Sequence, residues 1–343
     1  MTINRVSVIA CFGFNHNRVN GQNVKSRIIA KALEASTKIK KVDTSGRSNL
    51  LKLPFKILAS LFSSDNVIIM PAQNGLKVIM PLIALLNVFF GRKIHYVVIG
   101  GWLPDMVKNH KWLRFFLKKY DSIYVESVHM KHKLNLVNVE VMPNCKQLNI
   151  VETKVGFNIK KHQYRFCTFS RVIKEKGIED AIKAIELVKK RTNCLDLKLD
   201  IYGTIDEEQK EWFNRLLQKY SHVATYKGVV SFSDSSEILS TYYGLLFPTY
   251  YEGEGFAGTI IDAYAAGLPI IASDWKYNSE FVKDKINGLI HKVNDINDLA
   301  NCIIWAISHP NEWEAFGHRN NEEAKKYMPE KVVEKLVMNI NNK

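Results

Sequence analysis

The sequence has few cysteines, and none of them is spaced for pairing. Five cysteines are scattered over 343 residues without a C-x-x-C motif, which argues against a disulfide framework and against a zinc site. A reducing compartment, the cytoplasm, is therefore the expected location.

Long apolar runs, biased segments and repeats are also missing. The apolar run at residues 78–90 contains Pro81 and Asn87 and is shorter than the roughly 20 residues that a membrane-spanning helix needs. The first residues, MTINRVSVIACFGF, are typical of a buried strand and lack the features of an export signal. We therefore expect a chain that is folded throughout and has no transmembrane helix.

Length and charge indicate two domains of different character. A chain of 343 residues exceeds what one hydrophobic core usually supports. The formal net charge is +14, and residues 1–150 hold 22 Lys and Arg against 7 Asp and Glu, whereas residues 151–343 hold 26 against 27. A positive field on one half attracts polyanions or anionic lipid headgroups, and composition does not choose between them.

Short β-rich segments alternate with helical patterns, which is typical of parallel sheets with crossover helices. The predicted strands are residues 5–11, 66–70, 93–99, 122–126 and 139–144, then 165–170, 197–203, 223–229, 244–248, 268–273 and 288–291. Residues 150–163 are polar and rich in lysine, so we predict an N-terminal domain of residues 1–150 and a C-terminal domain of residues 151–343. The chain after Asp295 is expected to be mostly helical, and the last helix can pack back on the N-terminal domain.

The strongest local signal is residues 248–273, PTYYEGEGFAGTIIDAYAAGLPIIAS. A strand runs into a glycine-rich loop, and the pattern predicts a helix from about Gly258 that stops at Gly267. Glu254 lies in the loop, and Asp262 follows eight residues later in the helix. A carboxylate suits the vicinal diol of a ribose or a pyranose, and free N–H groups at a helix N-terminus favour a phosphate. The segment therefore predicts a site for sugar, ribose and diphosphate.

This segment resembles the E-x7-E region of the family 4 retaining glycosyltransferases, which have the GT-B architecture. The resemblance rests on E-G-F at 254–256, D-A-Y-A-A-G-L-P-I-I at 262–271 and N-G-L-I at 287–290. Asp262 stands where the family has Glu, so its carboxylate reaches one methylene less far. The resemblance implies an α/β fold of two Rossmann-like doubly wound domains that face each other across a cleft, with the donor held mainly by the C-terminal domain.

A second motif places two cations at a strand-to-helix turn within residues 168–182. Arg171 follows a predicted strand, and Lys176 precedes Gly177. A departing nucleoside diphosphate gains negative charge as the glycosidic bond breaks, and fixed cations stabilise that charge. The resemblance implies this role for the R-x-x-x-x-K-G turn. The predicted catalytic residues are therefore Glu254, Arg171 and Lys176.

No metal ion and no cofactor are expected, because Arg171 and Lys176 can replace a metal and the nucleotide sugar is a substrate. The sequence contains no D-x-D pair, the motif that glycosyltransferases of the other large architecture use to hold a divalent cation.

Further donor contacts are predicted in both domains. Gly21 stands where the family brings its backbone close to the donor phosphates. The predicted donor-binding residues are Gly21, Gly203, Val230, Gly255, Phe256, Gly258, Thr259 and Asp262. His95 and His110 are interpreted as structural.

A basic amphipathic segment, residues 105–120, interleaves lysines with aromatic side chains. It is suited to a membrane surface with anionic headgroups, and equally to a core-facing helix with a charged outer side. The residues predicted for the acceptor and membrane side are Trp102, Lys108, Lys111 and Arg114.

The predicted function is transfer of a sugar, with retention, from a nucleotide-diphosphate sugar to a saccharide or a lipid-linked saccharide during polysaccharide or glycolipid synthesis. Family frequency favours a UDP-sugar, and the expected location is the cytoplasm or the inner face of its membrane. A nucleotide-sugar epimerase or a phosphorylase of the same architecture is the first alternative. A non-catalytic polyanion- or lipid-binding protein is the second, and no nucleic-acid partner is expected because no motif for one is present.

Overall fold

The structure, a computed structural model, describes residues 5–14, 21–46, 52–151, 164–194 and 196–341. The chain forms two compact units. Unit 1 is Met1–Gln147 with Tyr327–Lys343, and unit 2 is Leu148–Lys326. The division lies three residues before the predicted domain boundary, and the end of the chain belongs to unit 1. Most of the predicted linker, residues 152–163, lies outside the described residues.

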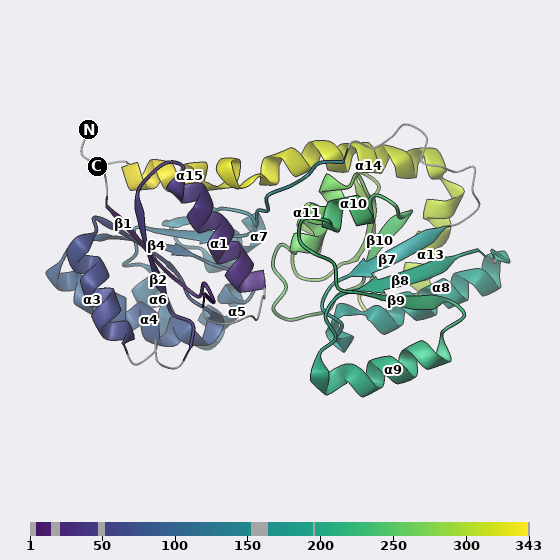
Figure 1. Cartoon of the computed structure of the whole chain (residues 1–343), viewed down its shortest axis with the longest axis horizontal. Helices are drawn as coiled ribbons and strands as arrows, with labels where there is room; N and C mark the ends of the chain where they lie inside the picture. The colour runs from purple at the N-terminus through teal and green to yellow at the C-terminus, as the bar shows by residue number, and fades with distance from the viewer. Residues whose placement is uncertain (1–4, 15–20, 47–51, 152–163, 195, 342–343) are drawn as a thin grey trace. The chain divides into compact units, whose positions relative to one another are not determined.

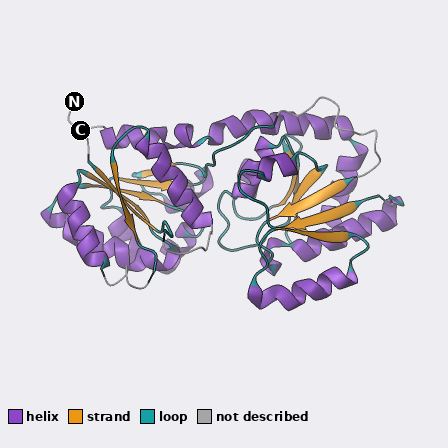
Figure 2. Cartoon of the chain, viewed as in Figure 1, coloured by secondary structure: helices purple, strands orange, loops and turns teal. Residues whose placement is uncertain are grey.

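Each unit contains a parallel six-stranded sheet between layers of helices (Figure 2). In unit 1 the strand order is β2-β1-β3-β4-β5-β6. The strands are β1 (Val6–Ala10), β2 (Ile39–Asp43), β3 (Asn66–Met70), β4 (Lys93–Val97), β5 (Ser122–Val125) and β6 (Val139–Val141). Ile9 of β1 pairs in register with Val42 on one side and with Ile69 on the other.

Two groups of helices cover the two faces of the unit 1 sheet, as right-handed crossovers require. Helices α1 (Gly21–Glu34) and α15 (Pro329–Asn341) share one core with alternate side chains of β1 and β3. The other face carries α3 (Leu53–Ser63), α4 (Gln73–Leu86) with η1 (Asn87–Phe89), α5 (Leu103–Asn109), α6 (Trp112–Leu117) and α7 (Val128–Leu134), as Figure 1 shows. No helix in the described part of the chain is long and apolar enough to cross a membrane.

Unit 2 has the strand order β12-β11-β10-β7-β8-β9. The strands are β7 (Arg165–Phe169), β8 (Lys198–Tyr202), β9 (Ala224–Gly228), β10 (Gly244–Phe247), β11 (Ile270–Ser273) and β12 (Gly288–His291). The chain leaves β7 toward β8 on one side and leaves β10 toward β11 on the other. The carboxyl ends of β7 and β10 therefore form the topological switch point, where open α/β sheets bind ligands.

Helices also cover both faces of the unit 2 sheet. Helix α8 (Ile178–Thr192) packs against α13 (Ile296–Ser308), and their apolar side chains share the main core of the unit with Phe166 and Leu199 of the sheet. The remaining helices are η2 (Lys174–Lys176), η3 (Glu207–Gln209), α9 (Lys210–Lys219), α10 (Ser235–Leu239), α11 (Gly258–Ala265), α12 (Asn278–Phe281), α14 (Pro310–Ala324) and η4 (Lys325–Tyr327).

Two sequence-based expectations need correction. Strand β2 was not predicted, because its sequence IKKVD places two exposed lysines at the edge of the sheet and buries only Val42 well. The basic segment 105–120 is two short helices rather than one, since the chain turns at His110, whose φ and ψ of −130° and 78° are not helical.

Candidate active site

Two glycines bring the turn after β7 against its neighbours. Gly177 has a φ of +70°, and a Cβ there would lie 2.1 Å from the carbonyl oxygen of Pro248, directly after β10. Gly203 has a φ of +135°, and a Cβ there would lie 1.8 Å from the carbonyl oxygen of Ser170. Only glycine permits these approaches. Lys176, which precedes Gly177, is therefore held beside the loop that follows β10.

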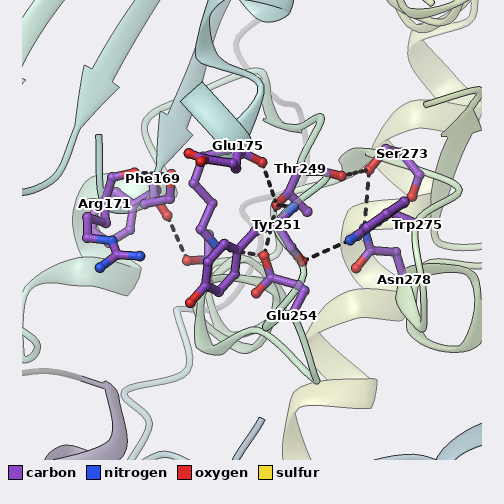
Figure 3. Close-up of polar contacts among 12 residues, drawn as sticks. Phe169, Arg171, Glu175, Thr249, Tyr251, Glu254, Ser273, Trp275 and Asn278 are labelled. Atoms are coloured by element: carbon purple, nitrogen blue, oxygen red, sulfur yellow. Dashed lines mark hydrogen bonds and ion pairs between the residues drawn. The ribbon is translucent and has the colours of Figure 1, made fainter. Parts of the chain in front are cut away.

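The predicted residues Lys176 and Glu254 meet at this place. Lys176 Nζ lies 2.5 Å from Glu254 Oε2, and both side chains are largely buried. The hydroxyl of Thr249, which is fully buried, lies 2.9 Å from the same carboxylate oxygen and 3.2 Å from the carbonyl oxygen of Glu175. The carboxylate is thus fixed by one cation and by one neutral donor from the end of β10 (Figure 3).

Tyr251 joins the two predicted cations. The centroid of its ring lies 5.0 Å from Lys176 Nζ and 5.6 Å from Arg171 Cζ, within the range of cation–π attraction. Tyr251 is fixed in turn, because its carbonyl oxygen accepts a 2.9 Å hydrogen bond from Trp275 Nε1 and its N–H donates to Thr249 Oγ1 (Figure 3). Among the described residues no acid forms an ion pair with Arg171, whose side chain is exposed.

A second set of hydrogen bonds ties the strand ends together behind the site. Ser273 Oγ, at the end of β11, donates to the carbonyl oxygen of Thr249 at 2.5 Å, and Asn278 Nδ2 donates to the carbonyl oxygen of Ser273 at 3.1 Å (Figure 3). The loop that carries Glu254 is therefore anchored on the sheet rather than free to swing.

The predicted donor-binding residues of the 254–262 motif lie around the start of α11. Phe256 is buried and stacks on Phe281 with 3.7 Å between ring centroids. Gly258 is the first residue of α11, and Thr259 Oγ1 donates to the carbonyl oxygen of Phe169 at 2.6 Å. This bond holds the N-terminus of α11 against the end of β7. Gly255 lies in the buried loop just before it.

Asp262 is connected to α10. It is buried on α11, and Ser235 Oγ donates to its Oδ1 at 3.0 Å. Gly203 directly follows β8, and Val230 lies half-buried shortly after β9. The structure thus brings Arg171, Lys176 and Glu254 together and places the other predicted donor residues of unit 2 after neighbouring strands or on α11.

Unit 1 presents a buried ion pair that was not predicted. Lys25 Nζ of α1 lies 2.5 Å from Glu126 Oε1, which also accepts a 3.0 Å hydrogen bond from the Gly100 N–H. The pair fixes the loop after β4, and its members are 101 residues apart, so no local pattern could reveal it. Gly21 begins α1, and a Cβ built there would meet no atom of the described residues within 4 Å beyond its chain neighbours and its own helix backbone. Residues 15–20 of the same predicted loop lie outside the described residues.

The residues predicted for the acceptor and membrane side divide into two pairs. Trp102 is buried and its indole N–H donates to the carbonyl oxygen of Ile99, so it cannot lie at a surface. The Arg114 guanidinium donates to carbonyl oxygens at the end of α7 at 2.8 and 2.7 Å. Lys108 and Lys111 are exposed. The membrane interpretation therefore does not fit Trp102, whose side chain is buried within unit 1, whereas Arg114 is half-buried and stays a prediction.

His95 is structural, as predicted. It is buried in β4 between Ser122 Oγ, at 2.7 Å, and Asn66 Oδ1, at 3.0 Å. Burial lowers the pKa of His95 to about 4, so the neutral ring is the stable form. His110 lies at the break between α5 and α6.

Thr249, Tyr251 and Trp275 were not assigned roles from the sequence. Thr249 and Tyr251 lie inside the predicted motif, and the aromatic residues beside Glu254 were a usable signal. Trp275 lies beyond the motif, and only its hydrogen bond reveals its role. Within the described ranges, no group of three His, Cys, Asp or Glu side chains is arranged to hold a metal ion.

Comparison with known proteins identifies the relatives of this chain. Poly(ribitol-phosphate) alpha-N-acetylglucosaminyltransferase of Staphylococcus aureus (strain COL) is 28% identical over 171 residues, which are 48% of this chain and 33% of that enzyme. The UDP-N-acetylglucosamine–peptide N-acetylglucosaminyltransferase GtfA subunit of Streptococcus gordonii is 32% identical over 145 residues, which are 42% of this chain and 27% of that subunit. The matched region thus spans about a third or less of the length of these relatives.

Structure comparison and a family model add to these relatives. HepE of Anabaena, solved in complex with UDP, superposes with a TM-score of 0.77 at 13% identity, covering 98% of this chain and 99% of that one. This likeness shows the two-domain α/β GT-B fold. Residues 150–325 match the sequence model of the family described as glycosyl transferases group 1. Since this match covers more than half of the length of this chain, the chain belongs to the glycosyl transferases group 1.

Proposed function

We propose that the chain transfers a sugar from a nucleotide-diphosphate sugar to a hydroxyl group of an acceptor. The observation that carries the proposal is the meeting of Arg171, Lys176 and Glu254 at the switch point of the unit 2 sheet. Family membership supports it, and so does the UDP bound in the Anabaena structure. UDP is the proposed carrier, in line with the donor named for the Streptococcus gordonii relative.

Arg171 and Lys176 act on the leaving group. When the bond between the anomeric carbon and the diphosphate breaks, its electron pair moves to a diphosphate oxygen. Two cations fixed against one aromatic ring stabilise that charge without reorganising. Because two cations can take the charge-stabilising role of a divalent metal, we propose that the reaction is independent of metal.

Glu254 is the residue nearest to the reacting sugar in this proposal. Lys176 and Thr249 both contact Oε2 of its carboxylate, so Oε1 is left to accept a hydroxyl of the donor sugar. We propose retention of configuration, as in the resembling family. The acceptor oxygen attacks the face that the diphosphate leaves, and its proton passes to the departing phosphate oxygen.

The nucleoside end of the donor is assigned to the loops after β8 and β9 and to α11. Asp262 would accept from the ribose hydroxyls, with Gly203 and Val230 along the base and ribose. Gly255, Phe256, Gly258 and Thr259 shape the approach of the diphosphate to the helix N-terminus. Gly21 would let the unit 1 backbone approach the donor phosphates.

The acceptor is proposed to be a saccharide or a lipid-linked saccharide, in polysaccharide or glycolipid synthesis. The five free cysteines suit a reducing compartment, so the cytoplasm is the proposed location. The lipid-linked form of the acceptor would require contact with the anionic inner face of the membrane.

A panel of nucleotide sugars tests the proposal. Each is incubated with the protein and EDTA, and released nucleoside diphosphate is measured with and without simple saccharide acceptors. We expect one donor, a UDP-sugar, to release UDP despite EDTA, and the product to keep the anomeric configuration of the donor by NMR. Epimerised donor without an acceptor would indicate an epimerase, dependence on inorganic phosphate a phosphorylase, and no binding of any donor a non-catalytic protein.

A further inference from the structure

Helix α3 is apolar on both of its sides. Ile57 and Leu61 are buried against the unit 1 sheet. Phe55, Leu58 and Phe62 follow at spacings of three and four residues, which places them in one stripe on the outward side. Phe55 is 74% exposed and Phe62 is 75% exposed. Helices that are apolar all round are normally covered all round, and no described residue covers this side of α3.

Helix α4 and the η1 turn, which lie beside α3, repeat the pattern. Leu76 and Ile83 are buried. Val78, Leu85 and Phe89 follow the helical spacing on the outward side, and Phe89 is 84% exposed. The outward stripe of α3 is therefore widened by a second one from the neighbouring helix.

Helix α6 packs on α4 and adds aromatic side chains. Trp112 and Phe115 point outward, and Phe115 is 60% exposed. Lys119 Nζ lies 4.7 Å from the centroid of the Phe115 ring. Figure 1 shows α3, α4 and α6 together on one side of the unit 1 sheet. We call the outward sides of these helices, with η1, the α3–α4–α6 face.

The stretch of chain that carries this face is strongly basic. Residues 52–121 contain ten Lys and Arg against three acids, Asp65, Asp105 and Asp121. Asp65 is already paired with Arg5 at 3.4 Å and with Arg92 at 3.7 Å. The exposed lysines include Lys52, Lys77, Lys111, Lys118 and Lys119.

We infer that the α3–α4–α6 face docks on the surface of an anionic lipid bilayer. Several large apolar side chains exposed on neighbouring helices are typical of an interaction site. Aromatic rings that enter the interface between headgroups and acyl chains, with lysines reaching the headgroup phosphates, fit this combination. A second copy of the chain is a poorer occupant, because a symmetric contact would place the same lysines against one another.

This inference goes beyond the proposed transfer reaction. It moves the membrane contact from the buried Trp102 to exposed apolar side chains on α3, α4, η1 and α6. Its test needs no turnover, so failure of the transfer proposal and failure of this inference can be told apart.

The test is co-sedimentation with vesicles of phosphatidylcholine, with and without roughly one third phosphatidylglycerol. The double variant Phe55→Ser/Phe89→Ser removes two outward rings. Met338→Ser is the matched control, because Met338 is 60% exposed on α15 across the same sheet. We expect the full chain to bind the anionic vesicles, to be released by high salt, and to lose affinity by about tenfold or more in the double variant. Binding by Met338→Ser should equal wild type.

Brominated lipids give a second readout. Trp112 should be quenched on binding, and the quenched component should disappear in Trp112→Phe. Equal binding to neutral vesicles, or unchanged binding by the double variant, would overturn the inference. So would a dimer in sedimentation that the same two substitutions dissociate without any vesicle binding, since it would assign the face to a second copy. Thermal unfolding of every variant should match wild type, because the altered side chains are exposed.

Discussion

At the residue scale, the Glu254 carboxylate is held by two neighbours of different chemical kinds. Lys176 contributes a positive charge. The hydroxyl of Thr249, which is fully buried just after β10, donates a hydrogen bond that orients the carboxylate. A carboxylate that accepts a hydrogen bond from a rigid neutral donor keeps its orientation even when the lysine binds a ligand instead. Thr249 is therefore a positioning residue in the proposed reaction.

Replacing Thr249 by Val, which keeps the shape and removes the hydroxyl, should lower kcat by about tenfold, the loss of one hydrogen bond in the transition state. The KM for the donor should change little, because the substitution does not touch the cations. Steady-state release of nucleoside diphosphate measures both constants. Thr249→Ser, which restores the hydroxyl, should recover the rate. A rise in KM at unchanged kcat would contradict a positioning role.

The charged members of the site were predictable and the neutral ones were not. Arg171, Lys176 and Glu254 stand out because charges beside glycines after predicted strands are unusual. Thr249 and Tyr251 contribute only because the backbone of the loop folds so that a hydroxyl and an aromatic ring contact those charges. Spacing along the sequence carries no information about that path.

At the element scale, the turn between β7 and α8 depends on close contact with β10. Gly177→Ala should destabilise unit 2 by about 3 kcal/mol or more, because the added Cβ would collide with the carbonyl of Pro248 in addition to straining a positive φ. Gly228→Ala is the control, since Gly228 has a φ of +85° but an added Cβ would meet no described residue within 4 Å other than its chain neighbours. Gly228→Ala should lower the free energy of unfolding by about 1 kcal/mol.

Chemical denaturation of the two glycine variants measures this difference. Equal free energies of unfolding for Gly177→Ala and Gly228→Ala would show that backbone strain alone matters. The close approach of the two loops would then not be needed for stability.

His95 in strand β4 makes the free energy of unfolding depend on pH. The pKa of His95 is lowered from 6.5 to about 4 by burial, so the unfolded chain binds the proton more tightly than the folded one. Stability should therefore be unaffected above pH 6.5 and should be lost as the pH falls from 6.5 toward 4, by up to about 3 kcal/mol. Urea unfolding against pH should show this loss in wild type, and His95→Gln should remove it. A wild-type curve parallel to that of His95→Gln would contradict the assignment.

Most strands were predictable because buried parallel strands form short apolar runs, such as NVIIM at β3. Strand β2 was missed because an edge strand keeps its lysines in water. The break between α5 and α6 was missed because Met106, Val107, Leu113 and Leu117 also fit one continuous helix. Apolar periodicity predicts which side of a helix is buried. It cannot reveal a turn after which the next helix buries the same side.

At the scale of the whole molecule, the end of the chain completes the first unit. Val332, Val333, Leu336 and Ile340 of α15 are buried in the core that α1 shares with the sheet. The sequence could place a helix there, but its packing partner lies about 300 residues earlier in the chain, beyond the reach of local patterns.

Leu336→Ala should therefore destabilise unit 1 by about 2–5 kcal/mol, since it opens a cavity in that core. Met338→Ala, two residues along the same helix and exposed, should cost almost nothing. Hydrogen exchange should show faster opening of β1 and α1 in Leu336→Ala while unit 2 is unchanged. Faster exchange confined to unit 2 would contradict the assignment of α15 to unit 1.

The central claim is that the turn after β7 stabilises a departing diphosphate. Its most direct test compares Lys176→Ala with Lys174→Ala in the release of UDP from the preferred donor. Both substitutions remove one lysine from the same turn, but only Lys176 contacts Glu254, whereas Lys174 lies over Trp212. We predict at least about a hundredfold loss of kcat for Lys176→Ala and a change within about twofold for Lys174→Ala. Equal rates for the two variants would contradict the claim.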